Sequence, residues 1–158
     1  MTGLVVERAD FAEPALLAFL QAHLDDMAPT APPESQHALD ARELQAPGVR
    51  LWVARSGGRI VGTVALAALE PAHEELKSMR TDPALRGAGV GSRMLRHALD
   101  DAASRGIARI SLETGAQDFF APARALYATH GFAPCPPFGD YWDDPLSAFM
   151  TRELAPGA

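Results

Sequence analysis

Apolar residues recur at every third or fourth position in two stretches of the chain. This spacing predicts amphipathic helices over about 11–27 and about 90–105. Asp10 precedes the first stretch as a candidate N-cap, and Gly106 stands where the second helix would end. The periodic positions are Leu16, Leu20, Leu24 and Met27 in the first stretch and Val90, Met94, Ala98 and Ala102 in the second.

Two more helices are predicted from their boundaries. One covers about 33–46, because Pro33 suits a first helical position and Pro47-Gly48 would end the helix. The other ends at His130, where Gly131 is the expected C-terminal glycine. With the two periodic stretches, the sequence predicts about four helices.

Short runs rich in β-branched and aliphatic residues separate these helices and predict strands. Gly57-Gly58 lies between two such runs and is typical of a tight hairpin turn. The element order β-α-α-β-β-β-α-β-α-β-β predicts a mixed α/β domain, and neither a regular βαβ repeat nor a sandwich. The predicted strands are Leu4–Val6, Leu51–Ala54, Ile60–Leu66, about Glu75–Thr81, Ile107–Glu113, Phe132–Ala133 and Ser147–Leu154.

Composition narrows the class of protein. With 158 residues, 47% hydrophobic and 22% charged, we expect one globular domain over 1–158. The net charge of −6 argues against nucleic-acid binding, which needs a basic face. No apolar run reaches the roughly 18 residues of a membrane span, and the first residues do not resemble a signal peptide. The single cysteine, Cys135, forms no internal disulfide, so we expect a cytoplasmic protein.

The most informative stretch is Arg86-Gly87-Ala88-Gly89-Val90-Gly91-Ser92, which follows a predicted strand and opens a predicted helix. Glycine lets a ligand approach the backbone closely, and the first amides of a helix have no partner within it. The helix dipole favours an anion at this end. The Ser92 hydroxyl and the Arg86 guanidinium add donors, so this turn predicts a pyrophosphate site.

Two other phosphate-binding motifs do not match the turn. A Rossmann fingerprint needs G-x-G-x-x-G in the first βα unit, whereas the spacing here is G-x-G-x-G after about three strands. A Walker A loop needs G-x-x-x-x-G-K-[ST], which the chain lacks. A strand-to-helix turn with no ligand stays open on glycine spacing alone.

Two motifs together resemble the GNAT superfamily of acyl-CoA-dependent N-acetyltransferases. Arg86–Gly91 matches its [QR]-x-x-G-x-[GA] element, and Leu126–Phe132 matches a late L-Y-x-x-x-G-F element. The resemblance covers nearly the whole chain and implies a single mixed, mostly antiparallel central sheet flanked by helices. A narrower resemblance is to bacterial GNAT proteins whose acceptors are unassigned. It rests on Pro33–Leu39, Glu75–Arg80, Leu112–Gly115, Asp140–Pro145 and Phe149–Thr151.

The resemblance implies acetyl-CoA as co-substrate and assigns roles by position. The backbone around Met79, Arg80 and Thr81 would bind the pantetheine arm, and Tyr127 would lie at the sulfur and protonate the departing thiolate. Many family members have an asparagine seven residues before this tyrosine, where this chain has Phe120; Asp118 is one substitute. The pyrophosphate would lie on Arg86, Gly87, Ala88, Gly89, Val90, Gly91 and Ser92.

The implied acceptor is a small-molecule amine, and removing its proton requires a base. Glu75 and Glu113 lie on the two strands expected to flank the reaction centre, with Glu75 slightly favoured; each is also interpretable as an ion-paired or surface carboxylate. Glu34, Ser35, His37 and Tyr141 are candidate acceptor contacts. The first three equally suit capping or solvated roles, and Tyr141 also suits a subunit interface.

No metal site is predicted, because the five histidines are scattered and none lies in H-E-x-x-H. Cys135 has no helix N-terminus to activate it, and no G-x-S-x-G elbow is present, so we expect direct attack without an acyl-enzyme. Three alternatives stay open: a peptide or protein N-acetyltransferase, a non-catalytic acyl-CoA sensor, and an unliganded interaction domain. The segment 28–39 is expected to separate a metabolite enzyme from a peptide enzyme. A homodimer is implied by the family resemblance alone.

Overall fold

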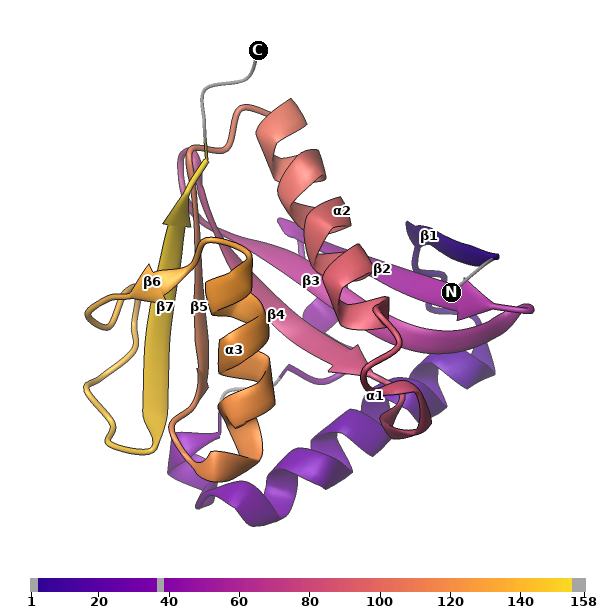
Figure 1. Ribbon diagram of the computed structural model, residues 1–158, viewed down its shortest axis with the longest axis horizontal. Helices are drawn as coiled ribbons and strands as arrows, with labels where there is room; N and C mark the ends of the chain where they lie inside the picture. The colour runs from indigo at the N-terminus through magenta and orange to yellow at the C-terminus, as the bar shows by residue number, and fades with distance from the viewer. Residues whose placement is uncertain (1–2, 37–38, 155–158) are drawn as a thin grey trace.

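The computed structural model describes residues 3–36 and 39–154. Seven strands form one sheet in the order β1-β2-β3-β4-β5-β7-β6, and every neighbouring pair is antiparallel except β4 and β5 (Figure 1). The strands are β1 (Leu4–Arg8), β2 (Val49–Ser56), β3 (Arg59–Glu70), β4 (His73–Thr81), β5 (Arg109–Gly115), β6 (Ala133–Pro134) and β7 (Ser147–Glu153). The α-helices are α1 (Pro14–Met27), α2 (Val90–Ser104) and α3 (Ala121–Thr129).

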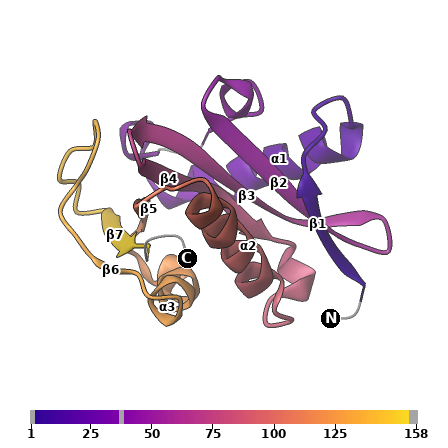
Figure 2. The ribbon, with the colours of Figure 1, turned by 90° about the horizontal axis from the view of Figure 1, so that it is seen from above.

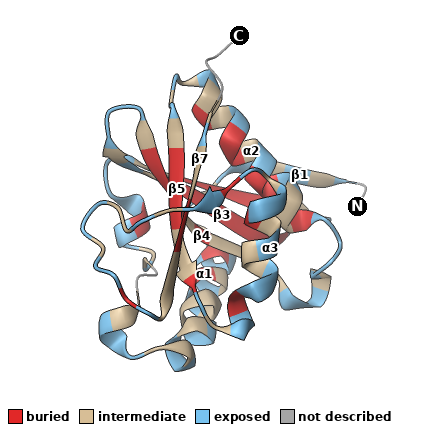
Figure 3. Cartoon of the chain, turned by 60° about the vertical axis from the view of Figure 1, so that its left-hand side comes forward, coloured by how far each residue is buried: buried red, intermediate tan, exposed pale blue. Residues whose placement is uncertain are grey.

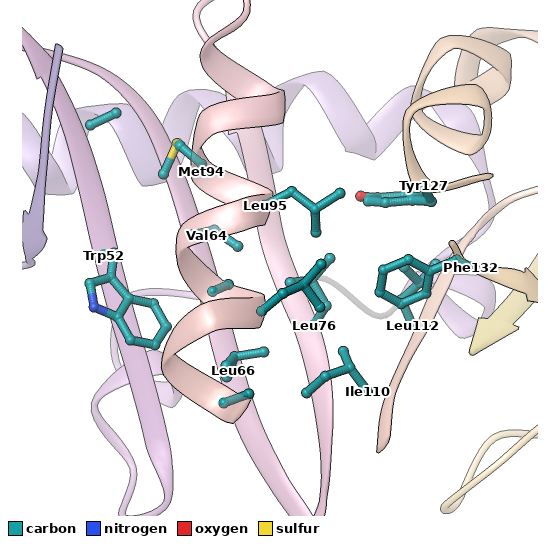
Figure 4. Packing of buried hydrophobic residues seen from close by; sticks show 14 of the residues in the cluster. Trp52, Val64, Leu66, Leu76, Met94, Leu95, Ile110, Leu112, Tyr127 and Phe132 are labelled. Carbon is teal, nitrogen blue, oxygen red and sulfur yellow. The ribbon is translucent and has the colours of Figure 1, made fainter. Parts of the chain in front are cut away.

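The helices cover both faces of the sheet. Figure 2 shows α2 and α3 on one face and α1 on the other. Alternation along the strands explains this: Trp52 packs with the α2 side, whereas its neighbour Val53 packs with Leu16 and Leu20 of α1. Figure 3 shows the buried residues concentrated on the central strands. On the α2 side the core runs from Trp52 at one end to Tyr127 and Phe132 at the other (Figure 4).

The predicted helix over 33–46 is wrong for the described parts of that range. Two short 3₁₀ turns, Pro33–Ser35 and Glu43–Gln45, stand there instead, so the described residues form three α-helices rather than about four. Asp40 and Glu43 exchange side-chain hydrogen bonds with each other's backbone N–H, at 2.8 and 3.2 Å. Local bonds of this kind start a turn, and Pro47 then prevents its continuation.

Strands β4 and β5 separate part-way along their length. Their parallel pairing extends only from His73 and Arg109 to Leu76 and Leu112. Beyond that point β4 stays with β3 and β5 stays with β7, so the two strands diverge (Figure 1). Ser78 lies at the divergence with φ +50°, within an irregularity of the β3–β4 register. The Thr63 hydroxyl donates to the Ser78 carbonyl at 2.8 Å and holds this bulge.

Gly115, at the end of β5, is expected to be intolerant of substitution. A Cβ there would lie 2.0 Å from Cδ2 of Phe120, whose ring covers the glycine. Gly115→Ala should therefore lower the free energy of unfolding by about 1–3 kcal/mol through overpacking. Urea denaturation checks this, with Phe120→Leu added as the second mutation of a cycle. An alanine cost that does not shrink in the Phe120→Leu background would contradict the explanation.

None of the described helices combines the length and apolar character needed to cross a membrane.

Candidate active site

A cleft of about 510 Å³ opens between the diverging end of β4, the glycine turn and α3. It is lined on one side by Met79, Arg80 and Thr81, and on the other by Ala123, Leu126 and Tyr127 of α3. The turn contributes Arg86, Gly87, Gly89, Val90, Gly91 and Ser92. Of the predicted cofactor residues, only Ala88 is outside this lining.

The glycine turn leaves its backbone open to the cleft. Gly87 and Gly89 have φ of +83° and +88°, a conformation that favours glycine, and a Cβ on either would meet nothing within 4 Å. The Arg93 N–H donates to the Gly89 carbonyl at 3.1 Å, which is the first hydrogen bond of α2. The amides of residues 90–92 precede that bond, so they form the donor-rich end of the helix.

Ser92 has a second partner beside the cleft. Its hydroxyl lies 2.8 Å from Nε2 of His130, which follows α3. Burial lowers the pKa of His130, and the charges of Arg96 and Arg152 lower it further. The hydroxyl predicted to meet a phosphate is thereby linked to the C-terminal end of α3.

A smaller cavity of about 120 Å³ adjoins the cleft on the β5 side. Its lining includes Leu76 to Met79 of β4, Glu113 to Gly115 of β5, and residues of the segment after α1. The two cavities share six lining residues, which are His23, Met27, Met79, Phe120, Ala123 and Tyr127. Tyr127 therefore stands where the cleft and the smaller cavity meet.

Tyr127 is held firmly at this junction. Its side chain is buried, with its ring edge-on to Phe132 at 5.9 Å between centroids. Figure 4 shows its hydroxyl oxygen on the side that faces α2. Burial raises the pKa of the Tyr127 hydroxyl, and the negative charge of Glu113 raises it further. The hydroxyl therefore stays protonated at neutral pH and is available as a donor.

The two candidate bases lie in different surroundings. Glu113 lines the smaller cavity and accepts a hydrogen bond from the Ser147 hydroxyl at 2.7 Å. Glu75 is buried, lines neither cavity, and bonds both Lys77 at 3.2 Å and the Tyr141 hydroxyl. The geometry favours Glu113 over Glu75, the reverse of the slight sequence preference.

Of the candidate acceptor contacts, some line the smaller cavity and others do not. Ser35 lines the smaller cavity, whereas Glu34 is exposed and does not. His37 lies outside the described residues. Tyr141 bonds Glu75 and Lys77, and its ring packs against Phe138 and Phe149 instead of lining the cavity.

Seven polar residues that line the smaller cavity were not predicted from the sequence, and Ser78, Gln117 and His23 are among them. Ser78 and Gln117 carry no pattern that separates them from surface residues. His23 lies four positions from both Phe19 and Met27 on α1. This helical spacing places the three side chains on the same face of the helix, so the sequence could have predicted that His23 faces inward. Burial, followed by the charge of Arg80, lowers the pKa of His23 to about 4, so the imidazole is neutral at pH 7.

Phe120 closes the position where many GNAT proteins have asparagine. It is 8% exposed and lines both cavities, so it supplies an apolar wall in place of an amide. Asp118 is exposed and lines neither cavity.

Within residues 3–36 and 39–154, no group of three or more histidine, cysteine or acidic side chains is arranged to hold a metal ion.

A profile of the Acetyltransferase (GNAT) family matches residues 16–132. The chain belongs to this family. As a GNAT enzyme it is an N-acetyltransferase that uses acetyl-CoA. The uncharacterized N-acetyltransferase YedL of Escherichia coli (strain K12) is 44% identical over 149 residues, which are 94% of each chain.

Solved structures agree with this membership. A Klebsiella pneumoniae protein assigned to the acyl-CoA N-acyltransferases has a TM-score of 0.81 and 29% identity, covering 97% of this chain and 99% of that one. An aminoglycoside 6′-N-acetyltransferase in complex with coenzyme A shares the fold, with a TM-score of 0.72 and 18% identity over 96% of this chain and 98% of that one.

Proposed function

We propose that this GNAT enzyme transfers the acetyl group of acetyl-CoA to a small-molecule amine by direct attack. One observation carries the proposal: the cleft beside the glycine turn joins a second, smaller cavity at Tyr127. Two reactants entering from opposite sides would meet at that point, which is the arrangement that direct transfer requires.

Acetyl-CoA would occupy the larger cleft. Beyond Leu76, β4 remains paired with β3 but not with β5, so its edge on the β5 side from Met79 to Thr81 can bind the pantetheine arm as an added strand. The amides of Gly87 and of Gly89 to Ser92, with Arg86 beside them, suit the pyrophosphate, whereas the Ala88 amide donates to the Leu85 carbonyl at 3.1 Å. The thioester would then lie between the bulge at Ser78 and Tyr127.

The amine must lose a proton before it attacks. With a pKa near 10.4, deprotonation at pH 7 costs about 4.6 kcal/mol. Glu113 is the base we favour, directly or through water, because it lines the cavity that would hold the amine. The nitrogen bonds to the thioester carbon, the carbon–sulfur bond breaks, and Tyr127 gives its proton to the departing sulfur. The second proton of the attacking nitrogen then returns to Tyr127, directly or through water.

An acyl-enzyme does not fit the site. Cys135 is the chain's single thiol, and it lines neither cavity. Burial raises the pKa of this thiol, which lowers the fraction present as reactive thiolate. Direct attack therefore needs fewer assumptions than a covalent intermediate.

The wall of the smaller cavity favours a metabolite over a peptide. Thr30, Ala31 and Gln36 form part of this wall. The Gln36 amide donates to the carbonyls of Ala28 and Ala31 at 2.8 and 2.5 Å, and the Gln117 amide donates to the Thr30 carbonyl at 2.7 Å. These hydrogen bonds hold the segment after α1 against the smaller cavity. A peptide acceptor would need an open groove at this place, so the closed wall favours a small molecule.

A thiol-release screen tests the proposal. Purified enzyme is incubated with acetyl-CoA and panels of amines, amino acids, polyamines and short peptides, and free CoA thiol is measured. We expect release with at least one small amine and none above background with peptides. Calorimetric binding of acetyl-CoA without release by any acceptor would instead indicate a sensor, and release with peptides alone would indicate a peptide enzyme.

A further inference from the structure

Ser92 of the glycine turn is hydrogen-bonded to a residue that lies outside the cleft. Its part-buried hydroxyl is 2.8 Å from Nε2 of His130. Ser92 lines the cleft, whereas His130 lines neither the cleft nor the smaller cavity. His130 follows α3 and directly precedes the glycine of the L-Y-x-x-x-G-F element, so this contact joins the two motifs that resemble the family. The His130 ring therefore reaches a ligand in the cleft through Ser92 rather than by direct contact.

The backbone of His130 is anchored from two sides. Its N–H donates to the carbonyls of Leu126 and Tyr127 at 3.2 and 3.0 Å. Its carbonyl accepts from Nη1 of Arg152, on β7, at 3.0 Å. These bonds hold the residue beside the first turn of α2, which favours a persistent contact between its ring and Ser92.

The charged groups that shift the pKa of His130 are cationic. Burial lowers this pKa, and Arg96 of α2 and Arg152 of β7 lower it further. The imidazole is therefore neutral at pH 7 and carries a single ring hydrogen, on either Nδ1 or Nε2.

The direction of the hydrogen bonds decides which nitrogen suits a phosphate ligand. The oxygens of a pyrophosphate diester only accept at pH 7, and the Ser92 hydroxyl has one hydrogen to give. A bare Nε2 would take that hydrogen and turn a lone pair of Ser92 Oγ toward the anion. With the ring hydrogen on Nε2, the imidazole donates to Ser92 Oγ and the hydroxyl hydrogen is left for the phosphate. Two donors in series also strengthen each other.

We propose that His130 is a positioning residue for acetyl-CoA: its Nε2–H donates to the Ser92 hydroxyl, which then donates to the pyrophosphate. This inference rests on the proposed function, which places the pyrophosphate at the glycine turn, and it assigns a further residue to that site. His130 sets the direction of one hydrogen bond and contacts neither the thioester nor the acceptor.

A double-mutant cycle measured by calorimetry with coenzyme A tests the coupling. Ser92→Ala should raise Kd about tenfold or more, the contribution of one hydrogen bond to a charged group. His130→Leu should raise Kd about threefold to tenfold, because the hydroxyl loses its orienting donor. The double variant should bind as Ser92→Ala alone does. An unchanged Kd in His130→Leu, or a His130→Leu penalty that persists in full without the Ser92 hydroxyl, would overturn the positioning role.

Two further variants separate positioning from packing. His130→Gln keeps an N–H at about the reach of Nε2, so its Kd should stay within about twofold of the wild type. His97→Leu is the matched control, since the His97 ring of α2 also packs in the protein, 5.5 Å from the Trp52 ring, but lines neither cavity. It should bind coenzyme A like the wild type. A loss in His130→Gln as large as that in His130→Leu would assign the effect to packing and overturn the proposal.

Nitrogen NMR locates the ring hydrogen directly. Long-range spectra of protein labelled with ¹⁵N-histidine distinguish the ring nitrogen that carries hydrogen from the bare one, and His130→Gln assigns the signals. We expect the hydrogen on Nε2 in the coenzyme A complex at neutral pH. A bare Nε2 in that complex would overturn the proposed donor chain.

The failure of this inference is distinguishable from the failure of the proposed function. If Ser92→Ala weakens binding and His130→Leu does not, only the role of His130 is overturned, and thiol release by the wild type still tests the transfer. If Ser92→Ala and the wild type bind coenzyme A equally well, the Ser92 contact to the pyrophosphate is contradicted together with this inference.

Discussion

Replacing Gly89 with leucine should weaken acetyl-CoA binding by about 100-fold or more, because two or more charge-assisted hydrogen bonds from backbone amides would be lost. Gly89 lines the cleft, has φ +88°, and immediately precedes the first turn of α2. A side chain here has open space, so it would extend into the volume proposed for the pyrophosphate. Isothermal titration calorimetry with acetyl-CoA measures the loss.

Gly58→Leu is the matched control for backbone strain. Gly58 lies in the β2–β3 hairpin with φ +81°, a Cβ there also meets nothing within 4 Å, and the residue does not line the cleft. Both variants should lose about 1–2 kcal/mol of stability from the left-handed backbone, whereas only Gly89→Leu should lose affinity. Equal affinities in the two variants would contradict a pyrophosphate site at the turn.

The elements that the sequence predicted best are those with a strong local cause. The four-residue spacing from Val90 to Ala102 predicted a helix over about 90–105, and α2 spans Val90–Ser104. Such a pattern is sufficient because the buried stripe alone decides the structure. The range 33–46 has no comparable stripe, so its proline boundaries suggested a helix that local side-chain bonds replace.

The site was harder to predict because its shape depends on contacts between distant segments. The glycine spacing identified the turn, since the cause there is local backbone conformation. Strand β4 diverges from β5 at the bulge that contains Ser78. Ser78 has a positive φ although it is not a glycine, so the sequence gives no sign of this backbone conformation. Glu75 lines neither cavity and bonds Lys77 of its own strand and the hydroxyl of Tyr141, which comes from a distant segment, so the choice between Glu75 and Glu113 depends on a contact that the sequence pattern does not show.

Tyr127→Phe should lower kcat by about 100-fold to 10,000-fold, the usual contribution of a positioned general acid. The change keeps the ring that packs against Phe132 and removes only the hydroxyl of this residue, which lines both cavities. Affinity for acetyl-CoA should therefore change little, and the melting temperature should stay near that of the wild type. Initial rates of thiol release and calorimetry on the same preparation separate these quantities.

The leaving group supplies the sharper test of the role of Tyr127. If the hydroxyl assists departure of sulfur, the deficit of Tyr127→Phe should shrink with an acetyl thioester whose thiol is more acidic, because that thiolate needs less help. The raised pKa of Tyr127 adds a second expectation. Since burial and Glu113 keep the hydroxyl protonated above its ordinary range, wild-type kcat should not fall on the alkaline side before pH 10. A deficit that is the same for both donors would assign Tyr127 to packing or cofactor positioning and remove it from the proton transfer.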